Sequence, residues 1–218
     1  AWRVARARFR VEGKVRITKS LYRDLRWWEH ELKSADHDGV PLAAAAAPPI
    51  GGGAMAIYAD ASGEGGFAAW TLAGSTVLFV EDAWSQEERD DLIICEKEML
   101  ASTLGLVALQ PEVGDAFVLS YTDNTNVLAA MRSMGSSSRR MQELLARRTA
   151  WMLRKRVVEA SARITTDNNV WADWGSRGRL AEVVAAARRM GLRARRVAMP
   201  PDWRDTAALR ALLPDSLE

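Results

Sequence analysis

Residues 55–62 read MAIYADAS, a short apolar run that ends at an aspartate, Asp60, and continues into small residues. The run has the length and composition of a β-strand. An aspartate at a strand end places a carboxylate at an open edge of a sheet. Whether Asp60 has a functional role therefore depends on whether other carboxylates reach the same edge.

The segments that follow predict an α/β domain whose mixed five-stranded sheet is flanked by helices. GFAAWTLA (66–73) and STVLFVED (75–82) predict a hairpin across Gly74 and Ser75. Strands joined by a tight turn are antiparallel, so the sheet cannot be purely parallel. Two more strands are predicted at AFVLSYTD (116–123) and VVEASARITT (157–166). Helices are predicted over residues 86–109, 124–134, 139–155 and 168–177.

The chain on either side of this region differs in composition. Residues 18–33 have apolar residues at helical spacing and Thr18 as a candidate cap, and residues 39–53 combine Pro, Gly and an alanine run. We expect three parts: a basic N-terminal helix and linker over 1–53, the α/β domain over 54–178, and a C-terminal extension over 179–218 with a helix, a short strand and a capping loop.

Charge is unevenly distributed along the chain although the net charge is only +2. Residues 136–196 carry 15 Lys and Arg against 5 Asp and Glu, whereas residues 36–135 carry 3 against 15. This segregation can place a polyanion-binding surface beside a patch that collects cations, and solvated helix faces are the alternative.

Cys95 is the only cysteine, which excludes an intrachain disulfide and a cysteine-based zinc site and fits a reducing compartment. No apolar stretch reaches the roughly 18 residues of a membrane span. The first residues, AWRVARARFR, are Arg-rich and lack an initiator Met, as in a transit peptide or a processed product, but they are poor in Ser. Nuclear, cytoplasmic and mitochondrial locations all stay open.

Four acids stand out by position. Asp60 and Asp123 end predicted strands, Glu98 lies in the first long helix, and Asp173 lies in the last helix of the domain. If the two strands are neighbours and the helices pack on them, the four carboxylates meet at one edge. Such a cluster needs divalent cations, and oxygen ligands favour Mg²⁺ or Mn²⁺. Two such ions support hydrolysis of a phosphodiester.

Each of these acids also has an ordinary interpretation. Asp60 and Asp123 are suited to strand-end turns, and Glu98 is one of many acids in its segment. Asp173 is spaced to pair with Arg177 one helical turn later. Position alone leaves both interpretations open.

The order of the motifs YADAS, EMLA, YTDN and ADWGSR resembles the ribonuclease H domain of reverse transcriptases. More narrowly, the segments DLRWWEHEL, AWSQEE, ICEKEMLA, YTDNTNVLAAMRSMG and NNVWADWGSRG resemble the DIRS-type retrotransposon branch. The resemblance covers roughly residues 15–178 and implies an RNase H-like fold over 54–178. It implies that two Mg²⁺ or Mn²⁺ ions are held by Asp60, Glu98, Asp123 and Asp173. Glu98 is preferred to Glu96 because Met-Leu-Ala follows it.

The resemblance implies a metal-dependent endonuclease that hydrolyses the RNA strand of RNA–DNA hybrids. The chain lacks the Tyr-x-Asp-Asp turn of polymerases, so a polymerase domain or a larger assembly is an expected partner, and no histidine follows His37. Two alternatives stay open: a recruited non-catalytic scaffold or RNA-binding subunit of a larger ribonucleoprotein, and a related integrase-like nuclease.

The charge map also predicts contacts to the nucleic acid. We expect five arginines to contact backbone phosphates: Arg139, Arg140, Arg147, Arg148 and Arg177. Asn124 follows Asp123 and is a candidate for contacting a 2′-hydroxyl, which distinguishes RNA from DNA. The alternative for Asn124 is a helix cap.

Overall fold

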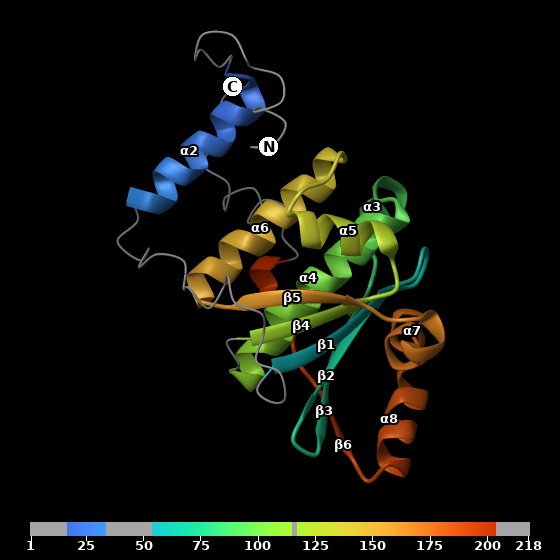
Figure 1. Ribbon diagram of the computed structural model, residues 1–218. Helices are drawn as coiled ribbons and strands as arrows, with labels where there is room; N and C mark the ends of the chain where they lie inside the picture. Colours follow the sequence, from blue (N-terminus) through green and yellow to red (C-terminus); the bar gives the residue numbers. More distant parts are fainter. Residues whose placement is uncertain (1–16, 34–53, 115–116, 204–218) are drawn as a thin grey trace.

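The computed structural model describes residues 17–33, 54–114 and 117–203 (Figure 1). The strands are β1 (Ala54–Ala61), β2 (Gly66–Ala73), β3 (Thr76–Ala83), β4 (Phe117–Thr122), β5 (Val158–Arg163) and β6 (Arg193–Arg196). The α-helices are α2 (Lys19–Lys33), α3 (Gln86–Asp91), α4 (Ile94–Val113), α5 (Thr125–Ser133), α6 (Arg139–Lys155), α7 (Val170–Ser176) and α8 (Leu180–Arg189). Two 3₁₀ turns are η2 (Thr166–Asn168) and η3 (Pro201–Trp203).

The strands form one mixed sheet in the order β5-β4-β1-β2-β3-β6. β1, β2 and β3 pair antiparallel, whereas β4 runs parallel to β1 and β5 parallel to β4. The α/β class and the mixed sheet predicted from the sequence are confirmed. The sheet has six strands where five were predicted, because the short strand of the C-terminal extension, β6, pairs in parallel with β3. Its sequence, RARR, lacks the alternation of apolar and polar residues that predicts a strand of the sheet.

Helices cover both faces of the sheet, and two glycines set how closely they approach. A Cβ added at Gly105 of α4 would lie 2.4 Å from the Cβ of Ala69, and one added at Gly175 of α7 would lie 2.4 Å from the Cβ of Ala68. Consecutive residues of a strand point to opposite faces, so α4 and α7 sandwich β2 between them. Figure 1 shows α5 and α6 beside α4, and α8 leading away from α7.

The helix predicted over 86–109 is in fact two helices. Ser85 caps α3 through a capping box with Glu88, and Leu92 is extended (φ −97°, ψ 128°), which breaks the helix before α4 begins. α4 then runs past Pro111 to Val113 and is capped by Gly114, whose φ of 82° is left-handed. Proline is tolerated there because only one backbone hydrogen bond of the last turns is lost.

Some expectations fall outside the described residues: the Arg-rich first residues, the 39–53 linker and residues 204–218. Within the described residues, no helix is long and apolar enough to cross a membrane.

Candidate functional site

The edge where β1 and β4 end carries two aspartates side by side. The parallel register pairs Tyr58 with Tyr121, so Asp60 and Asp123, each two residues further on, leave the sheet at the same edge. The side-chain period of two places the carboxylate of Asp60 on the face from which Tyr58 projects, and Asp123 directly follows the last residue of β4. This is the meeting of strand ends that the sequence predicted.

Glu98 joins the two aspartates from the first turns of α4, which packs on β1 and β2. Each of the three residues offers a carboxylate oxygen, and these oxygens all lie within 4.8 Å of one another. The side chains of Asp60 and Glu98 are buried and that of Asp123 is partly buried. Three segments far apart in the sequence therefore build one compact acidic cluster.

Burial and mutual repulsion disfavour the charged forms of two of these acids. Desolvation is the main reason why the pKa of Glu98 is raised to about 9, and the charges of Asp60 and Asp123 add to it. Burial also raises the pKa of Asp60 to about 6, against the opposing effects of a hydrogen bond from Ser176 and the charge of Arg177. The cluster therefore lacks enough positive charge from the protein.

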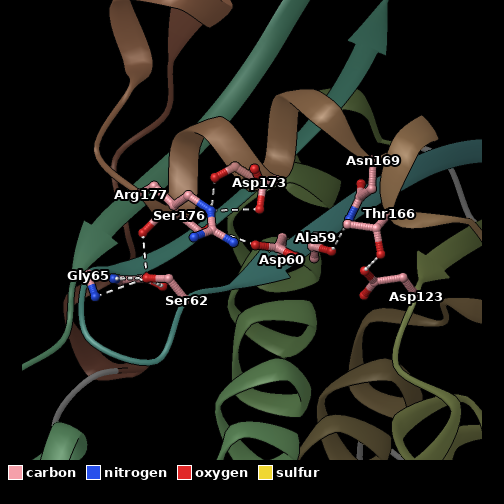
Figure 2. A network of polar contacts seen from close by, with 11 residues as sticks. Ala59, Asp60, Ser62, Gly65, Asp123, Thr166, Asn169, Asp173, Ser176 and Arg177 are labelled. Atoms are coloured by element: carbon pink, nitrogen blue, oxygen red, sulfur yellow. Dashed lines mark hydrogen bonds and ion pairs between the residues drawn. The ribbon is translucent and has the colours of Figure 1, made fainter.

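Asp173 lies near this cluster but outside the group of three. It belongs to α7, and its charge contributes to the raised pKa of Asp60. Arg177 holds it in an ion pair, with 2.8 Å from Nε to Oδ1. Figure 2 shows Asp173 and Arg177 on one side of Asp60 and Asp123 on the other. Both sequence interpretations of Asp173 thus have a basis: it stands beside the acids, and it pairs with Arg177.

Four polar contacts fix the positions of these acids, and sequence reasoning missed all of them. The hydroxyl of Ser176 donates to Asp60 Oδ2 at 2.6 Å, and that of Thr166 donates to Asp123 Oδ2 at 2.7 Å. Ser62 donates to the Ser176 carbonyl at 2.8 Å. Asn169 donates to the Ala59 carbonyl at 2.9 Å. Together these contacts fasten α7 and the turn before it to the ends of β1 and β4 (Figure 2). The small residues after Asp173 were the available signal.

Most arginines assigned to phosphates have partners within the protein. Arg139 pairs with Glu143 at 3.1 Å, and Arg140 lies 3.7 Å from Glu96 and donates to the Asp91 carbonyl. Arg147 is half-buried on the same helix.

Arg148 was assigned wrongly to the nucleic acid. It is 1% exposed and donates through Nε to Glu159 at 2.8 Å, so it cannot reach a phosphate. Adjacent residues of a helix point about 100° apart, which is why Arg147 and Arg148 differ so much in exposure.

Asn124 acts as the cap that the alternative interpretation proposed. Its Oδ1 accepts from the backbone N–H groups of Asn126 and Val127 at the start of α5. An N-terminal cap of this kind also fixes where Asp123, the preceding residue, sits. The amide nitrogen of Asn124 is not used by the cap.

The donor set of the acidic cluster fits a hard divalent cation. All three groups are carboxylates, and the described residues contribute no histidine or cysteine to the cluster. No Lys or Arg among the residues that the structure describes forms an ion pair with Asp60, Glu98 or Asp123. A cation from solution would supply the charge that the protein withholds.

No protein-family model matches this chain, and no curated protein matches it. Among solved structures, the chain is similar to the N-terminal RNase H domain of Rv2228c from Mycobacterium tuberculosis, solved as a fusion with maltose-binding protein. The identity is 17% and the TM-score 0.48, covering 62% of this chain and 99% of that one. It is also similar to RNase H1 from Halobacterium salinarum, with 14% identity, a TM-score of 0.46, and coverage of 60% of this chain and 99% of that one.

Proposed function

We propose that this chain is a metal-dependent endonuclease of the ribonuclease H type, which hydrolyses the RNA strand of RNA–DNA hybrids. The observation that supports it is the convergence of Asp60, Glu98 and Asp123 within 4.8 Å. Their order along the chain and their surrounding motifs resemble those of DIRS-type reverse transcriptases, so we also propose descent from such a retrotransposon. The nuclease core is residues 54–178, with a connection-like segment before it and an extension after it.

In this proposal the four acids Asp60, Glu98, Asp123 and Asp173 hold two Mg²⁺ or Mn²⁺ ions. Such ions would activate a water molecule and stabilise the leaving oxygen of the cleaved RNA strand. Glu98 must release its proton before it can bind a cation, because its pKa is raised to about 9 without one. Ser176 and Thr166 orient the carboxylates of Asp60 and Asp123, so less side-chain freedom is lost on binding.

Substrate contacts in this proposal come from the basic side chains and from one amide. Arg139, Arg140, Arg147 and Arg177 are proposed to meet phosphates, and Asn124 to offer its free amide N–H groups to a 2′-hydroxyl. Arg139 is exposed and its pair with Glu143 lies at the surface, and such a pair exchanges for a phosphate at low cost. Arg140 is itself exposed, and its distance of 3.7 Å from the buried Glu96 leaves room for a phosphate contact. A polymerase domain or larger assembly is the proposed source of the hybrid.

A second candidate is a recruited, non-catalytic scaffold or RNA-binding subunit of a ribonucleoprotein. One observation favours it: Asp173 is engaged by Arg177 and stands outside the three-acid group. A nuclease that has lost its reaction can keep such a pair, because nothing then requires Asp173 to be free for a cation.

Cleavage of a labelled RNA–DNA hybrid by the full chain, with Mg²⁺ or with EDTA, separates the two candidates. We expect cleavage of the RNA strand only with Mg²⁺, and a loss of at least about a hundredfold in rate for Asp123→Asn. Asp167→Asn is the matched control, since Asp167 is an exposed acid in η2 next to Thr166.

Two outcomes would contradict the nuclease. One is no cleavage by the intact, folded chain in Mg²⁺ or Mn²⁺, with hybrid binding retained, which supports the scaffold. The other is equal cleavage by Asp123→Asn and the unmodified chain, which points to a contaminating nuclease.

A further inference from the structure

Asn169 is a buried amide beside the acidic cluster, and it is only 1% exposed. It is the N-cap residue of α7, a position where asparagine ordinarily accepts hydrogen bonds from the first N–H groups of its helix. Its side chain makes no such bond. Instead, Nδ2 donates to the Ala59 carbonyl at 2.9 Å, so the side chain holds a strand and not its own helix.

This hydrogen bond lies where β1 and β4 separate. The parallel pairing of the two strands ends at Tyr58 and Tyr121, and Ala59 is the next residue of β1. The Ala59 carbonyl belongs to the planar peptide group that leads into Asp60, so a bond to it fixes the direction in which Asp60 leaves the strand. Asn169 therefore contacts the backbone of β1 just beyond the last residue that is paired with β4.

The backbone of Asn169 is bonded to the segments that position two other acids. Its N–H donates to the carbonyls of Thr165 and Thr166, at 3.1 Å and 3.0 Å, and the Thr166 side chain in turn holds Asp123. Its carbonyl accepts from the N–H of Asp173 at 3.0 Å. Together with the bond to β1, these contacts make one residue the link between the segments that position three of the four acids (Figure 2).

The unused half of the amide argues against a role in stability alone. Oδ1 of Asn169 is buried and has no hydrogen-bond partner among the described residues. A buried acceptor without a donor lowers the stability of the fold, and an apolar side chain of similar volume would bury no such atom. Stability alone therefore gives no reason for an amide here, whereas holding the end of β1 does.

We propose that Asn169 is a positioning residue of the cation site, which sets the distances among Asp60, Asp123 and Asp173 before a cation binds. The proposal rests on the proposed function for the identity of the site. Carboxylates that are already held near their bound positions lose less freedom when a cation binds. The affinity for the cation therefore depends on residues, such as Asn169, that do not touch it.

The test measures the apparent dissociation constant of Mg²⁺ for the full chain by isothermal titration calorimetry, without a nucleic acid. Asn169→Leu removes the donor and keeps a similar volume, and Asn169→Ala removes the side chain without adding bulk. The control is Thr103→Val, which deletes a buried hydroxyl that donates to the Met99 carbonyl at 2.8 Å and accepts from Arg148 at 3.2 Å. Neither of these two bonds involves one of the acids. Thermal melting without Mg²⁺ compares the stabilities of all variants.

We expect both Asn169 variants to raise the dissociation constant of Mg²⁺ about tenfold or more, while Thr103→Val lowers the melting temperature but changes the constant less than about twofold. An unchanged constant in a folded Asn169 variant, or an equal rise in Thr103→Val, overturns the proposal. Failure of both Asn169 variants to fold would make Asn169 a structural residue and would overturn it as well.

Failure of the proposed function is recognised separately, by incubating the same proteins with a labelled RNA–DNA hybrid at saturating Mg²⁺. If the unmodified chain binds Mg²⁺ but cleaves nothing, the nuclease is contradicted, and a loss of affinity in the Asn169 variants still supports the positioning role. If the unmodified chain cleaves and the Asn169 variants match it in affinity and in cleavage, only the positioning role is overturned.

Discussion

Two groups of buried charged side chains among the described residues differ in whether the protein supplies their partners. Behind the sheet, Arg148 of α6 meets Glu159 of β5, and its remaining N–H groups donate to Ser120 and Thr103 at 3.1 Å and 3.2 Å. At the sheet edge, Asp60, Glu98 and Asp123 stand together without a paired Lys or Arg among the described residues. The first site is complete within the chain, whereas the second is not.

The Arg148–Glu159 pair stabilises the fold by itself, whereas the acidic cluster has unpaired carboxyl groups that a cation can bind. A buried ion pair whose hydrogen bonds are all formed needs no further ligand. Buried carboxylic acids that lie close together either stay protonated or bind a cation. Without a cation, the raised pKa values of Asp60 and Glu98 favour the protonated forms. Substitutions in the Arg148–Glu159 pair and in the acidic cluster test this difference.

The largest expected effect comes from opening the complete site. Arg148→Met leaves Glu159 buried and unpaired, which should cost about 3–5 kcal/mol of unfolding free energy. Arg139→Met, which removes an exposed partner of Glu143, should cost under about 1 kcal/mol. Urea denaturation measures both. A loss below about 1 kcal/mol for Arg148→Met would show that the two sites do not differ as described.

A smaller effect is expected from supplying a cation to the incomplete site. Mg²⁺ at about a hundred times its dissociation constant should stabilise the protein by about 2.7 kcal/mol, because only the folded chain assembles the acids. For a chain of this length that corresponds to about 5–10 °C in melting temperature. Asp60→Asn should abolish the shift and Asp167→Asn should keep it. An equal shift in both variants would place the cation elsewhere.

A third effect, of similar size, is the pH dependence without a cation. Unfolded Glu98 loses its proton near pH 4.5, whereas folded Glu98 keeps it until about pH 9. The folded state therefore binds more protons in this range, and stability falls as pH rises. Asp60 acts in the same direction between its ordinary value of 3.8 and about 6.

In EDTA, the unmodified chain should lose about 3–4 kcal/mol of unfolding free energy between pH 6 and pH 9, which corresponds to roughly 7–15 °C in melting temperature. Glu98→Gln should flatten this dependence, because glutamine has no proton to lose. A chain whose stability rises over that range would contradict the assigned protonation of the cluster.

The strand ends could be predicted from the sequence because they depend on local patterns. MAIYAD and AFVLSYTD each show an apolar run that stops at an aspartate, and parallel neighbours bring such ends together. The class of fold followed from the same runs and from the Gly74–Ser75 turn. A short strand was expected in the C-terminal extension, but its pairing with β3 could not be predicted, because that pairing is made by backbone groups and leaves no apolar pattern in RARR.

The contacts that hold the acids could not be predicted, because they join residues distant in sequence. Ser176 reaches Asp60 across 116 positions, and Thr166 reaches Asp123 across 43. The prediction for Arg148 was wrong for a related reason: the sequence shows a run of charged residues on α6, but it does not show which of them faces Glu159. The break between α3 and α4 depends on the extended backbone at Leu92, which helical periodicity does not report.

The glycines on either side of β2 have a consequence for how mutations act. Because Gly175 lets α7 lie against Ala68, the distance between the aspartate of this helix and the strand acids depends on a missing methyl group. Alanine there would act as a wedge that moves Asp173 outward while leaving every acid in the sequence intact. In the proposed nuclease, alanine at Gly175 should therefore lower the rate of cleavage although Gly175 is not one of the acids, and a screen for inactive variants should recover Gly175 along with the carboxylates.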